Sequence, residues 1–202
     1  MKKIVIASSN LGKVAEIKSF QGLKGYEILT LQDFKGNWLP PKEIGKTYEE
    51  NALQKAHYYY EKIGLPILGD DGGLELAAFP ELLGLYTHRF FKTQIAKKQN
   101  QEILALYQGK KVSKEITLKA SLAYYAGKYQ QQIFSSELKG ELSKPQGNLG
   151  YGFDEIFYLP SLKKTLGQLP EEVRNQYSPR IQNLKKLTYY LEKGGKKYDG
   201  LH

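Results

Sequence analysis

The stretch "KKIVIASSNLGKVAEIKSF", residues 2–20, decides the fold, because a short polar turn joins an apolar run to a helical pattern. The mostly apolar run Lys3–Ala7 is followed by Ser-Ser-Asn, which predicts a strand and then a turn. Apolar residues then recur at helical spacing in Gly12–Phe20, which predicts a helix. A strand that leads directly into a helix is typical of α/β proteins.

The rest of the chain continues this mixture of strands and helices. Apolar runs predict further strands at residues 26–31, 66–69, 114–125 and 129–141. Helical spacing predicts further helices between Thr47 and Gly64, at 93–107 and from Pro170 onward. A turn at 126–128 joins two of the strands into a long hairpin. We therefore predict an α/β fold with this hairpin as a second lobe.

One of these helices is marked at both ends. Thr47 followed by Glu50 has the spacing of a capping box, and Gly64 is a stop signal. The predicted apolar face of the helix consists of Leu53, Ala56, Tyr60 and Ile63. The segment before it, "QDFKGNWLPPKEIG" (residues 32–45), contains glycine and two prolines and is predicted to be a loop.

Length and composition set the domain organisation. The 202 residues are enough for one large domain or two small lobes, and a hydrophobic content of 41% supports a core. We expect a single domain over residues 1–195 and a flexible tail over 196–202. The absence of cysteine excludes disulfides and a thiolate nucleophile, and it suits the cytoplasm. No apolar run approaches the ~20 residues of a membrane span, so we expect no membrane partner.

The charge of the chain is strongly positive. A formal net charge of +9 permits an anionic partner such as a nucleotide, a nucleic acid or a membrane surface. The lysines are scattered and no run forms a basic arm, so an ordinary solvated basic surface is the alternative. A nucleotide pocket needs few of these cations, and nucleic acid is not expected as the partner.

The turn after the first strand has the residue types of a phosphate site. The start of a helix offers free N–H groups and a partial positive charge. Ser8, Ser9 and Asn10 add short hydrogen-bonding side chains, and Lys13 adds a full charge. Together they predict a phosphate cradle that lacks the glycine pattern of a P-loop. The alternative is that these side chains only cap the helix.

A second candidate site is "PILGDDGGLEL", residues 66–76, where Asp70 and Asp71 follow an apolar run. α/β sheets place ligands beyond the ends of strands, and carboxylates suit Mg²⁺, which also keeps water and substrate phosphate as ligands. The alternative is an ordinary Asp-Gly turn. Glu43 in the preceding loop and Lys55 on the capped helix are weaker candidates by themselves.

A third candidate site is "GYGFDEIF", residues 150–157, where aromatic residues alternate with glycines before an aspartate. Glycine lets a ligand approach the backbone. Tyr151 and Phe153 have rings that can stack on a nucleobase. The surrounding segment, residues 143–160, is predicted to be a loop that ends in a short strand. If the two rings lay in a strand they would share one face, and packing in the core is the alternative.

Taken in order, five segments resemble the inosine-triphosphate pyrophosphatases, a family of non-standard purine nucleoside triphosphate pyrophosphatases. They span nearly the whole chain and read "ASSNLGKVAEIK", "EIGKTYEENALQKA", "DDGGLEL", "GLYTHRF" and "GYGFDEIF". The resemblance implies an enzyme that hydrolyses ITP, XTP and dITP to the monophosphate and pyrophosphate with Mg²⁺, and so cleanses the nucleotide pool. It also implies a long curved mixed sheet with helices, two lobes around a central cleft, and a homodimer.

The resemblance further implies roles for the residues that match the family's motifs. Glu43 and Asp71 match metal-binding acids, and Asp71 also matches the proton acceptor for the attacking water, with Asp70 as the neighbouring acid. The residues that match the triphosphate site are Ser8, Ser9, Asn10, Lys13 and Lys55. The residues that match the base site are Tyr151, Gly152, Phe153 and Asp154.

Some positions depart from the family pattern. Gly72 stands where the family has a serine near the substrate, and Arg174 stands for a lysine. Downstream, Ser178 and Arg180 remain, but Pro179 replaces a histidine that helps to read the purine 6-oxo group. We therefore expect the phosphate chemistry to be kept, with Arg180 as a donor to the 6-oxo group, and base selection to have a narrower margin.

Two alternatives to this function stay open. The first is a nucleoside triphosphate pyrophosphatase with altered base choice, because His88 matches another segment of the family and does not replace the missing histidine. The second is a nucleotide- or RNA-binding module that has lost turnover, which only the net charge of +9 supports. Release of pyrophosphate with Mg²⁺ separates an enzyme from a binding module.

Overall fold

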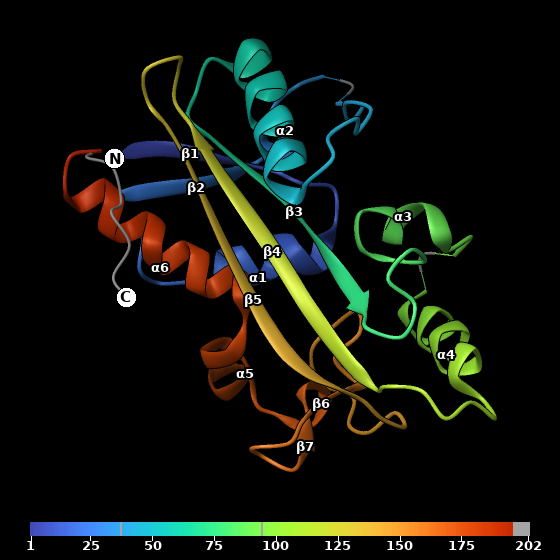
Figure 1. Ribbon diagram of the computed structural model, residues 1–202. Coiled ribbons are helices and arrows are strands. Elements are labelled where there is room, and N and C mark those ends of the chain that lie inside the picture. The colour runs from blue at the N-terminus through green and yellow to red at the C-terminus, as the bar shows by residue number, and fades with distance from the viewer. Residues whose placement is uncertain (37, 94, 196–202) are drawn as a thin grey trace. The chain divides into compact units, whose positions relative to one another are not determined.

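The structure is a computed structural model that describes residues 1–36, 38–93 and 95–195 (Figure 1). The tail predicted to be flexible, residues 196–202, lies outside the described residues. Within these ranges, the structure does not describe the side chains of Tyr86, His88 and Arg89. The prediction that His88 does not replace the missing histidine therefore lies outside the described residues. None of the described helices combines the length and the apolar character that crossing a membrane requires.

Strands and helices are mixed along the chain, as predicted for an α/β protein. The strands are β1 (Lys2–Ala7), β2 (Tyr26–Thr30), β3 (Ile67–Leu76), β4 (Glu115–Tyr125), β5 (Gln131–Leu142), β6 (Phe157–Leu159) and β7 (Lys164–Thr165). The helices are α1 (Leu11–Ser19), α2 (Tyr48–Ile63), α3 (Thr87–Phe90), α4 (Ala96–Tyr107), α5 (Glu171–Tyr177) and α6 (Pro179–Glu192). Short 3₁₀ turns lie at Leu31–Asp33, Gly84–Tyr86 and Leu166–Gln168.

In the described part of the chain, the strands form one seven-stranded sheet in the order β2-β1-β3-β4-β5-β6-β7. β1 pairs in parallel with β2 and with β3, so that Val5 lies beside Leu29 on one side and Ile67 on the other. β6 pairs antiparallel with β5 and β7. The mixed sheet that the resemblance implied is therefore confirmed.

The chain divides into two compact units. The first unit consists of Met1–Asp71, Ala120–Ser136 and the chain from Pro179, and the second of Gly72–Lys119 and Glu137–Ser178. β4 and β5 contribute to both units, so the prediction that their hairpin forms a lobe of its own was wrong. The reason is their length: strands of 11 and 12 residues are long enough to place one end in each core.

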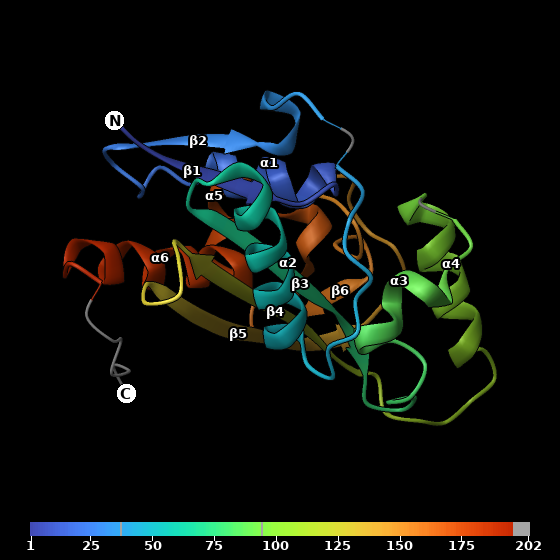
Figure 2. The same cartoon turned by 90° about the horizontal axis from the view of Figure 1, so that it is seen from above.

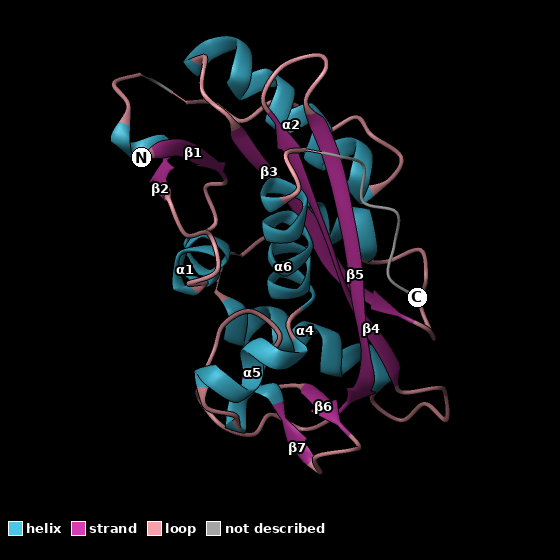
Figure 3. Cartoon of the chain, turned by 90° about the vertical axis from the view of Figure 1, so that its left-hand side faces the viewer, coloured by secondary structure: helices cyan, strands magenta, loops and turns pink. Residues whose placement is uncertain are grey.

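The first unit has a separate core on each face of β1. Side chains alternate between the faces of a strand. Ile4 and Ile6 therefore pack into one core with α1 and α6, and Val5 and Ala7 pack into the other core with α2. Figure 3 shows α1 and α6 near each other, and the two helices are in contact.

Helix α2 begins and ends where the sequence predicted. Thr47 Oγ accepts the N–H of Glu50 at 3.1 Å, and Gly64 ends the helix with a φ of 71°. The second half of the capping box differs, because the Glu50 carboxylate accepts the N–H of Lys46, at 2.6 Å, instead of that of Thr47. Of the predicted apolar face, Ala56 is fully buried, and the other three residues are partly buried against the same core.

The second unit has its own core, to which Leu74 and Leu76 of β3 and Ile103 of α4 contribute. Figures 1 and 2 both show α3 and α4 close together in this unit. Helix α4 begins at Ala96, three residues later than predicted. The cause is local, because Thr93 Oγ accepts the N–H of Ile95 at 3.1 Å and closes a turn before the helix.

Candidate active site

Asp70 and Asp71 lie inside β3, which continues without a break to Leu76. The alternative of an Asp-Gly turn is therefore wrong. Consecutive side chains of a strand point to opposite faces. Asp70 accordingly pairs with residues of α1 and α6, whereas Asp71 pairs with a residue of α2. The repulsion expected between adjacent carboxylates is avoided, because each has its own cation on its own side of the sheet.

Asp70 is buried and paired with two cations. The exposed fraction of its side chain is 0%. Lys13 Nζ lies 2.8 Å from Oδ2, and Arg180 Nε lies 2.7 Å from Oδ1. Burial alone would raise the pKa of Asp70, but the charges and hydrogen bonds of Arg180 and Lys13 outweigh burial and hold the pKa well below its usual range. Asp70 is therefore an ionised anchor for these two cations.

The ion pairs around Asp70 extend to Glu16 on α1. Arg180 Nη1 donates to Glu16 Oε2 at 2.5 Å, and Arg180 Nη2 donates to Asp70 Oδ2 at 3.3 Å. Four charged side chains thus alternate in sign, in the order Glu16, Arg180, Asp70 and Lys13, and their formal charges cancel. Glu16 was not predicted as a site residue, although it lies three residues after Lys13, on the same face of the helix.

Asp71 belongs to a second group of charges, on the face toward α2. Lys55 Nζ lies 2.6 Å from Glu43 Oε1 and 3.3 Å from Asp71 Oδ1, and it donates to the backbone carbonyl of Asp70 at 3.1 Å. Burial alone would lower the pKa of Lys55, but Asp71 and Glu43 outweigh burial and raise the pKa. Lys55 therefore stays protonated and is not a general base.

The donor set of this second group fits a divalent metal. Two carboxylates and one ammonium carry a formal charge of −1, which favours a further cation. Among the residues that the structure describes, no three acidic, histidine or cysteine side chains gather into a metal site. Mg²⁺ commonly binds through one or two carboxylates and completes its shell with water and substrate phosphate. Glu43 and Asp71 are the residues that would hold it.

The turn after β1 is closed by its own side chains. Asn10 Oδ1 accepts the N–H of Lys13 at 3.1 Å and so caps α1, and Ser8 Oγ accepts the N–H of Asn10 at 3.2 Å. The capping interpretation is therefore confirmed for Asn10. A capped helix still has further N–H groups in its first turn. Ser9 and Asn10 are exposed, so the turn is open to an anion.

In the second unit, residues 150–154 form a turn, so the loop predicted for this segment is confirmed and the two aromatic residues do not lie in a strand. Gly150 and Gly152 have φ values of 80° and 60°, which bend the chain. Asp154 closes the turn, because its Oδ2 accepts the N–H of Tyr151 at 3.0 Å. A Cβ at Gly150 would lie 2.0 Å from this oxygen, so glycine is required there.

The two aromatic rings of this turn have different surroundings. Tyr151 is 37% exposed. Phe153 is partly buried against the core of the second unit, and its ring centroid lies 6.2 Å from that of Phe91. Packing in the core is therefore confirmed for Phe153. Tyr151 is the ring that is accessible for stacking.

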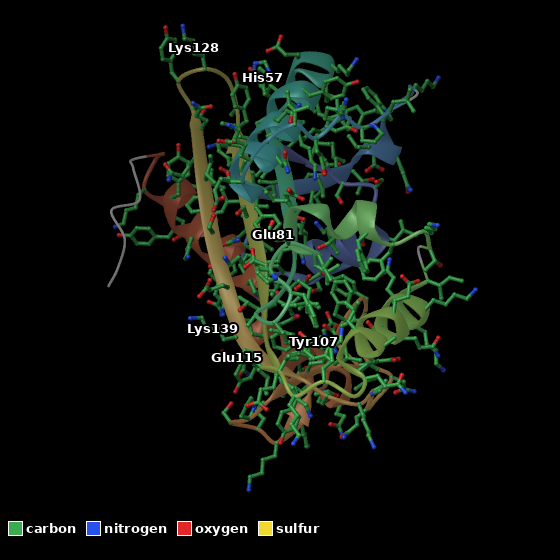
Figure 4. The ribbon with its side chains drawn as sticks, turned by 45° about the vertical axis from the view of Figure 1, so that its right-hand side comes forward. His57, Glu81, Tyr107, Glu115, Lys128 and Lys139 are labelled. Atoms are coloured by element: carbon green, nitrogen blue, oxygen red, sulfur yellow. The ribbon has the colours of Figure 1, made fainter. Side chains whose placement is uncertain are left out.

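Helix α4 holds the turn through Asn100, which the sequence analysis missed. Asn100 is 2% exposed, and its Nδ2 donates to the carbonyl of Gly152 at 3.2 Å. On the last turn of the helix, Tyr107, labelled in Figure 4, packs edge-on against Phe79 with ring centroids 5.1 Å apart. α4 thus contacts the rest of the second unit through Asn100 and through its last turn. The sequence signal for Asn100 was weak: a polar residue three positions before the buried Ile103.

The remaining candidates of the second unit surround α5. Arg174 Nε lies 3.6 Å from Asp154 Oδ2, and Arg174 Nη1 donates to the carbonyl of Leu169 at 2.9 Å. Ser178 ends the helix, with its N–H on the carbonyl of Arg174 at 3.1 Å. Pro179 is buried and begins α6 in the first unit, at a position where a helix tolerates the missing N–H of proline.

Arg180 lies in an environment that the sequence analysis did not predict. We expected its guanidinium to donate to a purine oxygen. In the structure Nε, Nη1 and Nη2 donate to Asp70 and Glu16, and the exposed fraction of the side chain is 9%. These contacts favour a role for Arg180 within the ion pairs of the first unit.

The structure therefore brings the predicted residues together in two groups. The first unit gathers Ser8, Ser9, Asn10, Lys13, Glu43, Lys55, Asp70, Asp71 and Arg180. The second unit gathers Tyr151, Gly152, Phe153, Asp154, Arg174 and Ser178, and it begins at Gly72, which follows Asp71 in β3.

Fold and charges together define an α/β protein with a mixed sheet and a group of acids and lysines suited to phosphate and a divalent metal. The chain belongs to the Ham1 family, whose model matches residues 4–190.

Curated relatives agree with this membership. The chain is 34% identical to a dITP/XTP pyrophosphatase of Dictyoglomus thermophilum, with 96% of this chain and 97% of the relative covered. It is also 34% identical to the dITP/XTP pyrophosphatase of Thermus thermophilus, with 95% and 93% covered.

Solved structures show the same fold. A Ham1 protein from Coxiella burnetii has a TM-score of 0.84 and 28% identity, with 96% of this chain and 100% of that chain covered. The Staphylococcus aureus Ham1 protein has a TM-score of 0.82 and 27% identity, with the same coverage of 96% and 100%. The α/β fold with a mixed sheet and helices that the resemblance implied is therefore confirmed.

Proposed function

We propose that this chain is a pyrophosphatase that hydrolyses non-standard purine nucleoside triphosphates, such as dITP, XTP and ITP, to the monophosphate and pyrophosphate, and so cleanses the nucleotide pool. Relatives named dITP/XTP pyrophosphatase support the substrate class. One observation carries the proposal: the partly buried ammonium of Lys55 holds the carboxylates of Glu43 and Asp71 together. This group combines metal ligands, a proton acceptor and a cation for phosphate.

In this proposal Asp71 is the general base. Its carboxylate takes a proton from the water that attacks the α-phosphorus. Lys55 and Lys13 hold the negative charge of the triphosphate and of the departing pyrophosphate. Positioning and electrostatic stabilisation of this kind account for most of the catalysis in phosphoryl transfer. Asp70 does not touch the substrate here and instead fixes Lys13, to which it is paired at 2.8 Å.

Mg²⁺ is the metal that we propose, with Glu43 and Asp71 as its protein ligands. Bound there, it would withdraw negative charge from the phosphates and help to position the attacking water. A homodimer and a place in the cytoplasm are further parts of the proposal. The first is supported by the family resemblance, and the second by the absence of cysteine.

The turn of residues 150–154 is the proposed base site. Tyr151 stacks on the purine, and stacking contributes affinity without distinguishing one base from another. Keto purines present an acceptor at the 6-position, where adenine presents a donor. Because Arg180 is engaged by Asp70 and Glu16, and residue 179 is proline, we expect discrimination against ATP to be modest.

A substrate panel tests the proposed function. We expect Mg²⁺-dependent release of pyrophosphate from dITP, XTP and ITP with a higher kcat/KM than from GTP or ATP. The measurement is pyrophosphate release from each of the five nucleotides, with and without Mg²⁺. Equal use of ATP and ITP would contradict the inosine assignment and support altered base choice. Binding of nucleotides without any release would support the binding module instead.

Removing either site lysine should weaken all nucleotides alike. Lys13→Ala and Lys55→Ala each remove a charged hydrogen bond to phosphate, which is worth about 1.5–3 kcal/mol, or roughly ten- to a hundredfold in kcat/KM. The ratio of kcat/KM for ITP to that for GTP should stay within about twofold, because phosphate is common to both. The control is Lys139→Ala on β5, at a side chain that is 78% exposed (Figure 4). A large change of the ITP/GTP ratio in a lysine variant would rule out this role.

A further inference from the structure

The loop before α2 carries Glu43 but has little regular structure of its own. Between Asp33 and Tyr48, the described residues form neither helix nor strand. Backbone N–H and C=O groups need partners, and a loop that lacks them does not hold a side chain in one place. The position of the Glu43 carboxylate therefore depends on what binds the backbone on each side of it.

Side chains of α2 bind that backbone on both sides of Glu43. Gln54 Nε2 donates to the carbonyl of Lys42 at 2.9 Å, and Gln54 Oε1 accepts the N–H of Ile44 at 3.4 Å. One amide group thus bridges the two residues that flank Glu43. Its orientation is chemically determined, because a backbone carbonyl can only accept and an N–H can only donate.

Two further side chains of α2 continue the clasp. Asn51 Oδ1 accepts the N–H of Gly45 at 2.9 Å, and Glu50 Oε2 accepts the N–H of Lys46 at 2.6 Å. Asn51 is 3% exposed. We use the name α2 clasp for the three side chains that bind this loop, Glu50, Asn51 and Gln54.

The same helix supplies the cation that Glu43 meets. Lys55 lies four residues after Asn51, so the two side chains share one face of α2. The loop backbone and the carboxylate of Glu43 are therefore both bound by side chains of α2. Lys55 Nζ lies 2.6 Å from Glu43 Oε1 because the clasp holds the loop against this helix.

Gly45 lets the loop approach α2 closely. A Cβ at this position would lie 2.5 Å from Asn51 Oδ1 and 2.8 Å from Glu50 Cβ. A larger residue would push the loop away from the helix, and Glu43 with it.

We propose that Asn51 and Gln54 are positioning residues, which act through the backbone of residues 42–45 to keep the Glu43 carboxylate beside Asp71 for the metal. The inference rests on the proposed function, because it takes Glu43 and Asp71 as the metal ligands. It adds residues that neither touch the substrate nor bind the metal.

The test compares Gln54→Leu with a matched control, Gln99→Leu. Gln99 on α4 makes the same kind of bond, since its Nε2 donates to the carbonyl of Thr93, in the loop before its own helix, at 2.7 Å. No residue of the proposed site lies in that loop. Each variant removes a glutamine amide that binds the loop before its own helix. If these glutamines only stabilise the fold, the Mg²⁺ requirement should change equally in both variants.

The first readout is amide hydrogen exchange and does not depend on activity. In Gln54→Leu the N–H of Ile44 should exchange about three- to tenfold faster, the fold-change expected from one neutral hydrogen bond. The N–H of Lys46, which is bound by Glu50, should keep its protection. In Gln99→Leu both N–H groups should behave as in the wild type.

The second readout is the Mg²⁺ concentration that gives half-maximal pyrophosphate release. In Gln54→Leu it should rise about three- to tenfold, while kcat at saturating Mg²⁺ stays within about twofold of the wild type. Asn51→Asp keeps an oxygen acceptor for the N–H of Gly45, so this N–H should stay protected from exchange. Gly45→Ala should raise the Mg²⁺ requirement at least as much as Gln54→Leu.

Two results overturn the inference while the proposed function stands. One is faster exchange at Ile44 with an unchanged Mg²⁺ requirement, and the other is an equal rise in Gln54→Leu and Gln99→Leu. A wild-type protein without Mg²⁺-dependent release from any nucleotide overturns the proposed function itself, and the role in metal binding with it.

Discussion

Asp71→Asn abolishes turnover and leaves the fold intact. We expect kcat for pyrophosphate release to fall by about 10²–10⁴-fold, because asparagine is isosteric with aspartate but does not accept a proton from water. Loss of a metal ligand adds to this effect. The fold should persist, since Lys55 keeps its ion pair with Glu43 at 2.6 Å when the pair with Asp71, at 3.3 Å, is lost. The measurements are single-turnover kinetics with ITP and thermal unfolding.

The control for this variant is Glu81→Gln, the same change of carboxylate to amide at an exposed residue of the second unit (Figure 4). It should leave kcat and the unfolding temperature unchanged. Turnover near the wild-type level in Asp71→Asn would show that the proton acceptor lies elsewhere.

Asp70→Asn should reduce the stability of the protein more than its turnover, in contrast to Asp71→Asn. The variant leaves Lys13 and Arg180 without their shared carboxylate, a buried side chain whose exposed fraction is 0%. Removing one partner of a buried ion pair costs about 3–5 kcal/mol. We expect the free energy of unfolding, measured by urea denaturation, to fall by about this amount. Any folded fraction should keep turnover above that of Asp71→Asn.

A surface ion pair is the control for this second variant. Lys3 Nζ and Glu27 Oε2 lie 3.9 Å apart, with side chains 50% and 46% exposed. Glu27→Gln should therefore change the free energy of unfolding by less than about 1 kcal/mol. If Asp70→Asn were as stable as Glu27→Gln, the ion pairs of Asp70 would not hold the first unit together.

Local pattern was sufficient for much of the fold. The apolar run in β1, the spacing in α1 and the turn between β4 and β5 are properties of neighbouring residues, and the structure confirms all three. The same holds for the Thr47 cap and the Gly64 stop of α2, since a cap is a bond between residues three apart. Segments in the right order were also sufficient to indicate the family, which the match over residues 4–190 confirms.

Local pattern was a poor guide to the backbone conformation of the glycines after Asp71. After Asp71, Gly72 and Gly73 suggested a turn, but pairing within the sheet keeps them in β3. At Gly150 and Gly152 the loop predicted from the sequence is confirmed, since both residues have positive φ and the carboxylate of Asp154 closes a turn. Glycine permits either backbone conformation, so its neighbours in space decide between them.

The sequence by itself indicated most of the charged residues of the candidate site, and only the tertiary structure added Glu16 and decided how they are paired. Asp70 meets Arg180 across 110 residues, and Asp71 meets Lys55 across 16 residues. Neighbours in a strand point to opposite faces, so two adjacent aspartates acquire different partners as soon as helices cover both faces of the sheet. One aspartate is then enclosed as a structural anchor, and the other is held beside Glu43 and Lys55, where we propose the chemistry takes place.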